Sequence, residues 1–241
     1  MKAIVTGHSK GLGAALANAL LSTGIPVLGL ARTSSAQLLA AFPSLMAEVD
    51  IDLGDSAALA RWLHSPALGH YLDDCSTAVV INNAGIVEPV GALSQQDPLQ
   101  VAKAVALNIA APLMIASAFV AATKGKQRRV LHISSGAGRS PYPGWSVYCA
   151  TKAALDHHAR AVALDAEAGV RICSLAPGVV DTGMQAAIRA TPSDRFPLRQ
   201  RFVDLKRGGQ LLAPADCAAQ VIAYVLSASF GDVSVDDLRN S

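Results

Sequence analysis

Short runs of apolar residues alternate along the chain with longer segments rich in alanine and leucine. The short runs are apolar throughout, which is typical of parallel strands whose two faces are both covered by helices. They predict strands at residues 3–6, 27–30, 45–49, 78–81, 130–133 and 171–175. The longer segments have helical spacing and predict helices at residues 11–23, 56–68, 99–107, 110–122 and 148–168.

This alternation predicts an α/β fold: a single Rossmann-type doubly wound parallel sheet of about seven strands, with helices on both faces. No repeat or change in composition divides the chain, so residues 1–241 are expected to form one domain with this fold. Residues 191–209 fit neither pattern, because they combine prolines and glycines with scattered charges. Such a segment suits a substrate-covering loop, and an ordinary surface loop explains it equally well.

Composition narrows the class of protein. The 241 residues are 51% hydrophobic and 16% charged, which excludes a disordered chain and allows a large core. The net charge of +2, without blocks of like charge, favours neither nucleic acid nor a membrane surface as the partner. Four widely spaced cysteines without a CxxC pattern are predicted to be reduced thiols.

The expected location is the cytoplasm. The residues after Met1 show no signal-peptide pattern and lead directly into a glycine motif. The longest apolar stretch, residues 109–122, is shorter than the roughly 18–20 residues that a membrane span needs. We therefore expect a soluble protein that acts on a small molecule.

Three glycines follow the first predicted strand and precede the first helix. In this position Gly7 would make a tight turn, Gly11 would let the backbone approach a pyrophosphate, and Gly13 would allow close packing of helix on strand. The phosphates of a dinucleotide would then bind at the helix N-terminus, where free N–H groups and the helix dipole favour negative charge. An ordinary turn is the alternative.

The second predicted strand is followed by Arg32, where folds that prefer NAD usually have an acidic residue. Arg32, together with Lys10 of the glycine loop, is suited to bind a 2′-phosphate through charged hydrogen bonds. The two cations therefore predict NADP(H) as the cofactor. A solvated arginine at the end of a strand is the alternative interpretation.

Tyr148 and Lys152 are four residues apart in a predicted helix, so they lie on one face, one turn apart. An ammonium group beside a phenol favours the phenolate, so the pKa of Tyr148 is predicted to fall below its usual value of about 10. Tyr148 would then serve as a general acid near neutral pH. Ser135, at the end of a strand, would donate a hydrogen bond to the same carbonyl oxygen; its neighbour Ser134 is the alternative.

Together with Asn82-Asn83-Ala84-Gly85, Asn108 and Pro177-Gly178, these motifs resemble the short-chain dehydrogenase/reductase family over almost the whole chain. The resemblance implies hydride exchange between a nicotinamide cofactor and a carbonyl or alcohol. It also implies that Tyr148 is the acid, that Ser135 polarises the carbonyl, and that Lys152 holds the nicotinamide ribose. The cofactor-binding residues that it implies are Gly7, Ser9, Lys10, Gly11, Leu12, Gly13, Arg32, Asp52, Leu53, Asn82, Ala84, Gly85, Tyr148, Lys152, Pro177, Gly178, Val180 and Thr182.

Some of these positions have a simpler interpretation. The resemblance gives Asn108 a water that connects Lys152 to solvent, and it gives Asp52 a contact with the adenine. In the simpler interpretation Asn83 serves only the central sheet, and Asp52 caps the helix that begins near Asp55. The histidines are not spaced as metal ligands, so no metal site is predicted.

Within the family, residues 144–150, residues 176–185 and Val235-Asp236 are similar to the sepiapterin reductases, and the benzil reductases share the layout. The resemblance implies reduction of an α-dicarbonyl compound or a pterin side-chain ketone. Trp145 would stack on an aromatic substrate or pack beneath a loop. Asp236 would pair with the amino group of a pterin or lie in a polar turn. An NAD-linked alcohol dehydrogenase and a non-catalytic NADP-binding sensor are the alternative functions.

The predicted helix at residues 109–123 is apolar on nearly all sides, so it needs cover beyond one face of the sheet. In the family that the chain resembles, the fourth and fifth crossover helices pair across a two-fold axis. A homodimer is therefore predicted, with a homotetramer as the alternative.

Overall fold

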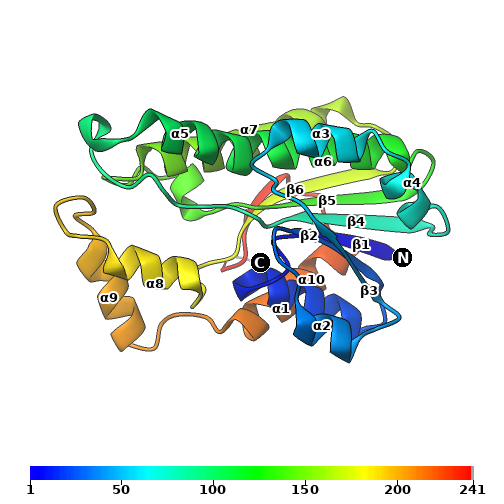
Figure 1. The fold of residues 1–241 in the computed structure, drawn as a ribbon, viewed down its shortest axis with the longest axis horizontal. Helices are drawn as coiled ribbons and strands as arrows, with labels where there is room; N and C mark the ends of the chain where they lie inside the picture. Colours follow the sequence, from blue (N-terminus) through cyan, green and yellow to red (C-terminus); the bar gives the residue numbers. More distant parts are fainter. Residues whose placement is uncertain (240–241) are drawn as a thin grey trace.

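A computed structural model describes residues 1–239 and contains one seven-stranded sheet. All neighbouring strands are parallel, in the order β3-β2-β1-β4-β5-β6-β7 (Figure 1). The predicted doubly wound parallel sheet is therefore confirmed. The strands are β1 (Lys2–Thr6), β2 (Val27–Ala31), β3 (Met46–Asp50), β4 (Thr77–Asn82), β5 (Gln127–Ile133), β6 (Val170–Ala176) and β7 (Val235–Asp237).

Helices cover both faces of the sheet (Figure 1). One face carries α1 (Gly11–Ser22), α2 (Ala36–Ala41) and α10 (Pro214–Leu226). The other carries α3 (Ser56–Leu63), α4 (Ala67–Leu72), α5 (Pro98–Val105), α6 (Ala111–Ala122) and α7 (Ser146–Asp165). The helix predicted over residues 56–68 is two helices, because Pro66 has no N–H to donate and restricts the preceding residue.

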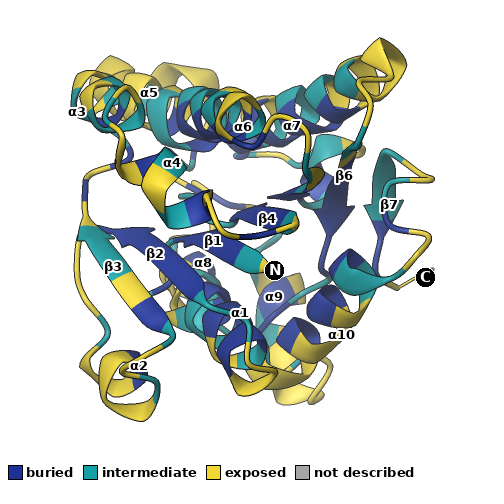
Figure 2. Ribbon diagram, turned by 90° about the vertical axis from the view of Figure 1, so that its right-hand side faces the viewer, coloured by how far each residue is buried: buried dark blue, intermediate teal, exposed yellow. Residues whose placement is uncertain are grey.

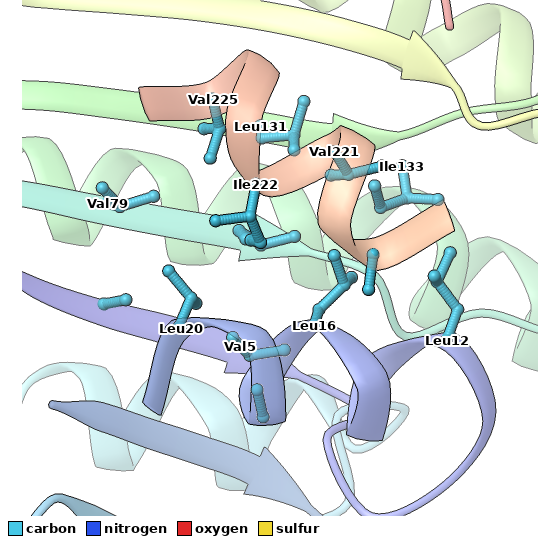
Figure 3. Close-up of a cluster of buried hydrophobic side chains, with 14 of the residues drawn as sticks. Val5, Leu12, Leu16, Leu20, Val79, Leu131, Ile133, Val221, Ile222 and Val225 are labelled. Carbon is cyan, nitrogen blue, oxygen red and sulfur yellow. The ribbon is translucent and has the colours of Figure 1, made fainter. Parts of the chain in front are cut away.

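Two apolar cores lie between the sheet and the helices that cover it, one on each face. Successive residues of β1 point to opposite faces, so Val5 packs with α1 and α10 while Ile4 packs with the helices of the other face. Figure 3 shows Leu16 of α1 and Ile222 of α10 meeting over the sheet. The five inner strands are largely buried, whereas the edge strands β3 and β7 and the outer helix faces are partly exposed (Figure 2), as expected for a sheet covered on both sides.

Helices α5 and α6 are joined by a π-helical turn, Ala106–Ala110, into one helical run. Residues Pro98–Ala122 form 25 residues of helix that are long and apolar enough to cross a membrane by length and composition alone. The sequence pattern underestimated this length, because Pro112 lies in the first turn of α6 and does not interrupt the run. In the structure Ile115 and Phe119 of this run are buried against the sheet.

Residues 191–209 contain more regular structure than their composition predicts. Helix α8 (Gly183–Ala190) ends just before this segment, and α9 (Arg199–Arg207) lies within it. Both helices lie beyond the carboxyl ends of the strands (Figure 1). The helical pattern of α9 is weak, because five of its nine residues are charged. Its position is set by Phe196 and Phe202, which are buried against Trp145.

Candidate active site

A cavity of about 880 Å³ opens at the carboxyl ends of the strands. It lies where the chain turns to opposite sides of β1, since β1 pairs with β2 on one edge and with β4 on the other. Ligands of open α/β sheets bind at this kind of switch point. The glycine loop, the Ser135 turn, the start of α7 and the segment after β6 all line the cavity.

The glycine loop forms the wall beneath α1. Gly7 and Gly11 have positive φ angles of 68° and 56°, which side chains other than glycine rarely adopt. A Cβ atom on Gly13 would lie 2.0 Å from the carbonyl oxygen of Gly7, so close packing of α1 on the loop requires glycine there. All six predicted loop residues line the cavity: Gly7, Ser9, Lys10, Gly11, Leu12 and Gly13. This cradle of backbone fits the pyrophosphate of a dinucleotide.

A buried histidine that the sequence pattern did not single out fixes the loop in place. The His8 ring lies against β2, where a Cβ atom on Gly29 would come within 2.4 Å of it. Its Nε2 atom is 2.8 Å from Oε1 of Glu48 in β3. Gly29 therefore leaves room for the imidazole, and His8 anchors the loop to two neighbouring strands.

Two exposed cations, Lys10 and Arg32, line the same part of the cavity. Between them, Thr33 donates a hydrogen bond of 3.0 Å to the Ser9 hydroxyl, which joins the glycine loop to the segment after β2. An exposed guanidinium and an exposed ammonium on adjacent loops are suited to bind a phosphate group.

Asp52 also lines the cavity, and it does not cap α3. The cap is Asp55, whose carboxylate accepts hydrogen bonds from the N–H groups of Ala57 and Ala58. The Asp52 carboxylate accepts a hydrogen bond of 2.9 Å from the N–H of Gly54. The alternative role of Asp52 as the helix cap is therefore wrong.

The residues after β4 divide between the sheet and the cavity. Thr6 accepts hydrogen bonds of 2.9 Å from the N–H groups of both Asn83 and Ala84, and the Asn83 amide donates to the Thr6 carbonyl. Asn83 thus braces β1 against β4, and it also lines the cavity with Ala84 and Gly85. Asn82 requires a correction: its side chain is buried between the Pro112 carbonyl and His132 and does not line the cavity.

Tyr148 lies in the first turn of α7, is 8% exposed and lines the cavity. Its hydroxyl lies near enough to Ser135 for that side chain to lower the pKa of Tyr148. Lys152 lies one turn further along, with Nζ 5.7 Å from the centre of the Tyr148 ring, and it donates a hydrogen bond of 2.8 Å to the Ile133 carbonyl. Both side chains line the same cavity, so the structure brings together the three residues that the sequence singled out.

The predicted acidity of Tyr148 requires a correction. Burial raises its pKa to about 12, and the Ser135 side chain only partly opposes this effect. Burial also lowers the pKa of Lys152 to about 8, while the Asp156 carboxylate opposes that shift. Desolvation disfavours the charged form of each group, and here it outweighs the attraction on which the sequence argument relied.

The choice between the two serines is decided by Asp156. Ser134 donates a hydrogen bond of 2.7 Å to the buried Asp156 carboxylate, which also accepts one from Ser174. Ser135 instead lies near the Tyr148 hydroxyl. The structure therefore favours Ser135 as the serine at the reacting group.

Asn108 lies in the π-helical turn behind Lys152. Its amide nitrogen donates to the Ile86 carbonyl and to the Thr151 hydroxyl, and its oxygen accepts a hydrogen bond from the Ile86 N–H. A Cβ atom on Gly85 would lie 3.2 Å from the Asn108 oxygen and 3.8 Å from Nζ of Lys152. Asn108 thus ties the segment after β4 to the helix that carries Lys152.

The segment after β6 closes the cavity opposite the glycine loop. Pro177, Gly178, Val180 and Thr182 all line it. Gly178 has a φ angle of 82°, and Val180 forms an isolated parallel bridge with Leu212. The Thr182 side chain lies against Gly11, where an added Cβ would be 3.5 Å away.

Trp145 and Asp236, which were predicted to contact the substrate beside Ser135 and Tyr148, differ in their position relative to the cavity. Trp145 lines the cavity but is only 4% exposed, and its ring stacks on Phe196 with centroids 4.6 Å apart. Packing beneath the segment at residues 191–209 therefore occupies much of this indole. Asp236 does not line the cavity. It lies in β7 rather than in a turn, and its side chain is hydrogen-bonded to Tyr224 of α10.

Several cavity residues escaped the sequence analysis. Tyr142 lies in the loop before α7, and its neighbours Pro141 and Pro143 were the signal of an irregular segment near Tyr148. Arg201 and Phe202 belong to α9, and Arg239 follows β7. Four further residues come from α8 and α9: Met184, Gln185, Ile188 and Leu205. Among residues 1–239, no group of three His, Cys, Asp or Glu side chains is arranged to hold a metal ion.

The fold and the site together define a dinucleotide-binding oxidoreductase, and comparison with known proteins gives its family. A family model described as short chain dehydrogenase matches residues 1–193. The chain belongs to the short-chain dehydrogenase family. It is therefore an oxidoreductase of CH–OH and C=O groups that uses a nicotinamide cofactor.

Relatives with two different names are similar over nearly the whole chain. A benzil reductase of Bacillus cereus that forms (S)-benzoin is 36% identical over 88% of this chain and 88% of its own length. A sepiapterin reductase of Meriones unguiculatus is 35% identical over 89% of this chain and 86% of its own. Among solved structures, a short-chain dehydrogenase/reductase of Burkholderia vietnamiensis is 48% identical, with a TM-score of 0.73 over 99% of this chain and 97% of its own.

Proposed function

We propose that this protein is an NADPH-dependent carbonyl reductase that acts on α-dicarbonyl compounds or pterin side-chain ketones. One observation carries the proposal: Ser135, Tyr148 and Lys152 meet at the cavity, beside a glycine loop suited to a dinucleotide. When bound, the cofactor supplies the hydride. The side chains of this chain supply binding, orientation and the proton.

Tyr148 holds the proton that the reduced carbonyl oxygen must receive. With its pKa raised to about 12 it is protonated at neutral pH, and an alkoxide is a stronger base than a phenolate, so the proton passes from Tyr148 to the product oxygen. The Lys152 ammonium favours the phenolate that remains. Ser135 donates a hydrogen bond to the same oxygen and fixes its position.

The cofactor preference rests on Lys10 and Arg32. Both are exposed at the cavity and suited to the 2′-phosphate of NADPH. An NAD-linked alcohol dehydrogenase would be expected to have an acidic residue near Arg32 to bind the ribose hydroxyl. Asp52 would contact the adenine, while Gly7, Gly11 and Gly13 would receive the pyrophosphate.

The substrate class is supported by the two groups of relatives. Benzil and sepiapterin reductases are both similar to this chain at 35–36% identity. These similarities support a benzil reductase and a sepiapterin reductase equally well. The segment at residues 191–209 would cover the substrate, since Phe202 and Leu205 of α9 line the cavity. We further propose that the enzyme is cytoplasmic and works as a homodimer.

The test is the oxidation of NADPH with benzil and sepiapterin, followed for the wild type and for Tyr148→Phe. The variant lacks the proton donor, so its kcat should fall by about 100-fold or more while NADPH still binds. Loss of NADPH binding together with activity would instead indicate a structural role for Tyr148. If the wild type binds NADPH and reduces no carbonyl compound, the protein is a sensor rather than a reductase.

A further inference from the structure

We propose that the substrate of this site carries a carboxylate, which is bound by Arg239, next to an apolar and preferably aromatic body. The inference rests on the proposed carbonyl reductase function and names its substrate class: 2-oxo carboxylates, in which the carboxylate adjoins the ketone. Reduction adds a hydride equivalent from the reduced cofactor to the ketone carbon and a proton to its oxygen. The carboxylate is unchanged, and the product is a 2-hydroxy acid.

Arg239 lies at the reacting end of the cavity. A Cβ atom on Gly136, next to Ser135, would be 3.9 Å from its Nη2 atom, and a Cβ atom on Gly178 would be 3.9 Å from its Cδ atom. The side chain thus lies between the turn that carries Ser135 and the segment that follows β6. Both segments line the cavity, and so does Arg239 itself.

The guanidinium of Arg239 is held in position but remains accessible. Asp237 accepts two hydrogen bonds from it, from Nε at 2.8 Å and from Nη2 at 2.6 Å. Asp237 is in turn 3.6 Å from Nη1 of Arg139, which also donates a hydrogen bond to the buried Asp156. The Arg239 side chain is 62% exposed, so its remaining N–H groups can bind a ligand in the cavity.

The charges around this end of the cavity favour an anion. Arg201 adds a second cation, since its guanidinium is 6.0 Å from the ring centre of Tyr142, and Tyr142, Arg201 and Arg239 all line the cavity. Within residues 1–239, Asp52 is the single acidic residue that lines the cavity, and it follows β3, which is separated from β7 by the five other strands of the sheet. An arginine fork matches the geometry of a carboxylate.

The same charges disfavour the amino group of a pterin. The predicted anchor for that group, Asp236, faces Tyr224 of α10 instead of the cavity. The cavity wall also includes Trp145, Phe202 and Ile188, which belong to one apolar cluster. A substrate with a hydrogen-bond acceptor at one end and an apolar ring at the other therefore suits this site better than a substrate that presents a hydrogen-bond donor to the arginines.

The test compares benzoylformate with its uncharged methyl ester, and benzil serves as a third substrate. For each protein the measured quantity is the ratio of kcat/KM for benzoylformate to kcat/KM for the ester. Arg239→Met should lower this ratio by a factor of about 10 to 100, the range for one charged hydrogen bond, mainly by raising KM for benzoylformate. Arg239→Lys should keep part of the ratio, because it keeps the charge but loses the fork.

The matched control is Arg207→Met, which removes an exposed arginine of α9 that does not line the cavity. Its ratio should equal that of the wild type. A binding measurement gives a second readout: benzoate should inhibit the wild type at least tenfold more strongly than benzamide.

Each outcome decides a different claim. An unchanged ratio in Arg239→Met, or equal inhibition by benzoate and benzamide, overturns the carboxylate inference and leaves the reductase function standing. If the wild type reduces neither these three substrates nor sepiapterin, the proposed function itself fails, and the carboxylate inference fails with it.

Discussion

Tyr148 and Lys152 carry opposite charges when ionised, and burial acts against both. The pKa of the phenol rises to about 12 and that of the ammonium falls to about 8. At neutral pH this leaves a neutral phenol next to a lysine that is largely protonated. Asp156, one further turn along α7, stabilises the ammonium and also holds Ser134 beside Ser135.

Lys152 predicts the pH dependence of carbonyl reduction. Because its pKa is about 8, the rate should fall as the pH rises through that value and the ammonium loses its proton. The Asp156 carboxylate raises the pKa of Lys152, so Asp156→Asn should move this alkaline limb to lower pH. The measurement is kcat against pH at saturating substrate, with Asp165→Asn at the exposed end of α7 as the control. A limb that stays in place, or that moves to higher pH, contradicts the role of Asp156.

Arg32 predicts the choice of cofactor. Arg32→Ala should lower the ratio of kcat/KM for NADPH to kcat/KM for NADH by about 10–100-fold, since one charged hydrogen bond to the 2′-phosphate is lost. Arg61→Ala, an exposed arginine of α3 outside the cavity, is the control. Equal ratios for Arg32→Ala and the wild type would mean that Arg32 is merely solvated.

At the scale of elements, polar groups buried between β5 and its covering helices hold the layers in register. His132 of β5 lies 3.1 Å from His158 of α7 through Nε2 and 3.2 Å from the Asn82 amide through Nδ1. Burial lowers the pKa of His132 to about 3, so the ring is neutral in the folded protein at neutral pH. The pair therefore joins β4, β5 and α7 without a buried charge.

This histidine predicts how stability depends on pH. Because the folded pKa of about 3 lies below the unfolded value of about 6.5, the contribution of His132 is present above pH 6.5 and is lost as the pH falls towards 3. Between pH 7 and pH 5, this group should remove about 2 kcal/mol from the free energy of unfolding. The loss should be absent in His132→Gln and present in His157→Gln, an exposed neighbour on α7. Urea denaturation at both pH values measures it, and equal losses in the wild type and His132→Gln would contradict the assignment.

At the scale of the whole molecule, the helical layer formed by α5, α6 and α7 exposes large apolar side chains. Leu99 of α5 is 78% exposed and Leu164 of α7 is 86% exposed. A groove between α6 and α7 is lined by Val120 and Val162 together with polar residues such as Lys124 and Asp165. Apolar surface of this kind favours contact with a second copy of the chain.

We therefore predict a symmetric dimer through α6 and α7. Light scattering at micromolar concentration should give twice the mass of the 24.8 kDa chain. Leu164→Glu should shift the population towards monomer, because it places a charge in the apolar contact. Leu93→Glu, which changes an exposed leucine outside these helices, should leave the dimer intact. A monomeric wild type would rule the interface out.

Local patterns were sufficient for strands β1 to β6 and for the glycine loop, but not for β7, whose short polar sequence was not predicted as a strand. Continuous apolar runs predict buried parallel strands because both faces of each strand meet helices. Gly7, Gly11 and Gly13 could be identified from their spacing after the first strand alone. The pairing of Tyr148 with Lys152 follows in the same way from one turn of helix. These features depend only on residues that are close together along the chain, so they can be predicted from the sequence.

The substrate end of the cavity could not be predicted in this way. Tyr142, Arg201 and Arg239 come from a loop, a weakly patterned helix and the residues after the last strand. They meet only because Phe196 and Phe202 pack on Trp145 and because β7 pairs with β6. Asp236 and Asp237 are adjacent in the sequence, and the pleat of β7 decides which of them faces Arg239.

The amino-acid sequence by itself determined the class of fold, the place of the glycine loop and the residues that we propose exchange the proton. Tertiary structure alone decided the ionisation of those residues and the charge at the end of the cavity where we propose that the substrate binds. The physical reason is that desolvation and electrostatic fields depend on every group that surrounds a site, and most of those groups are distant along the chain.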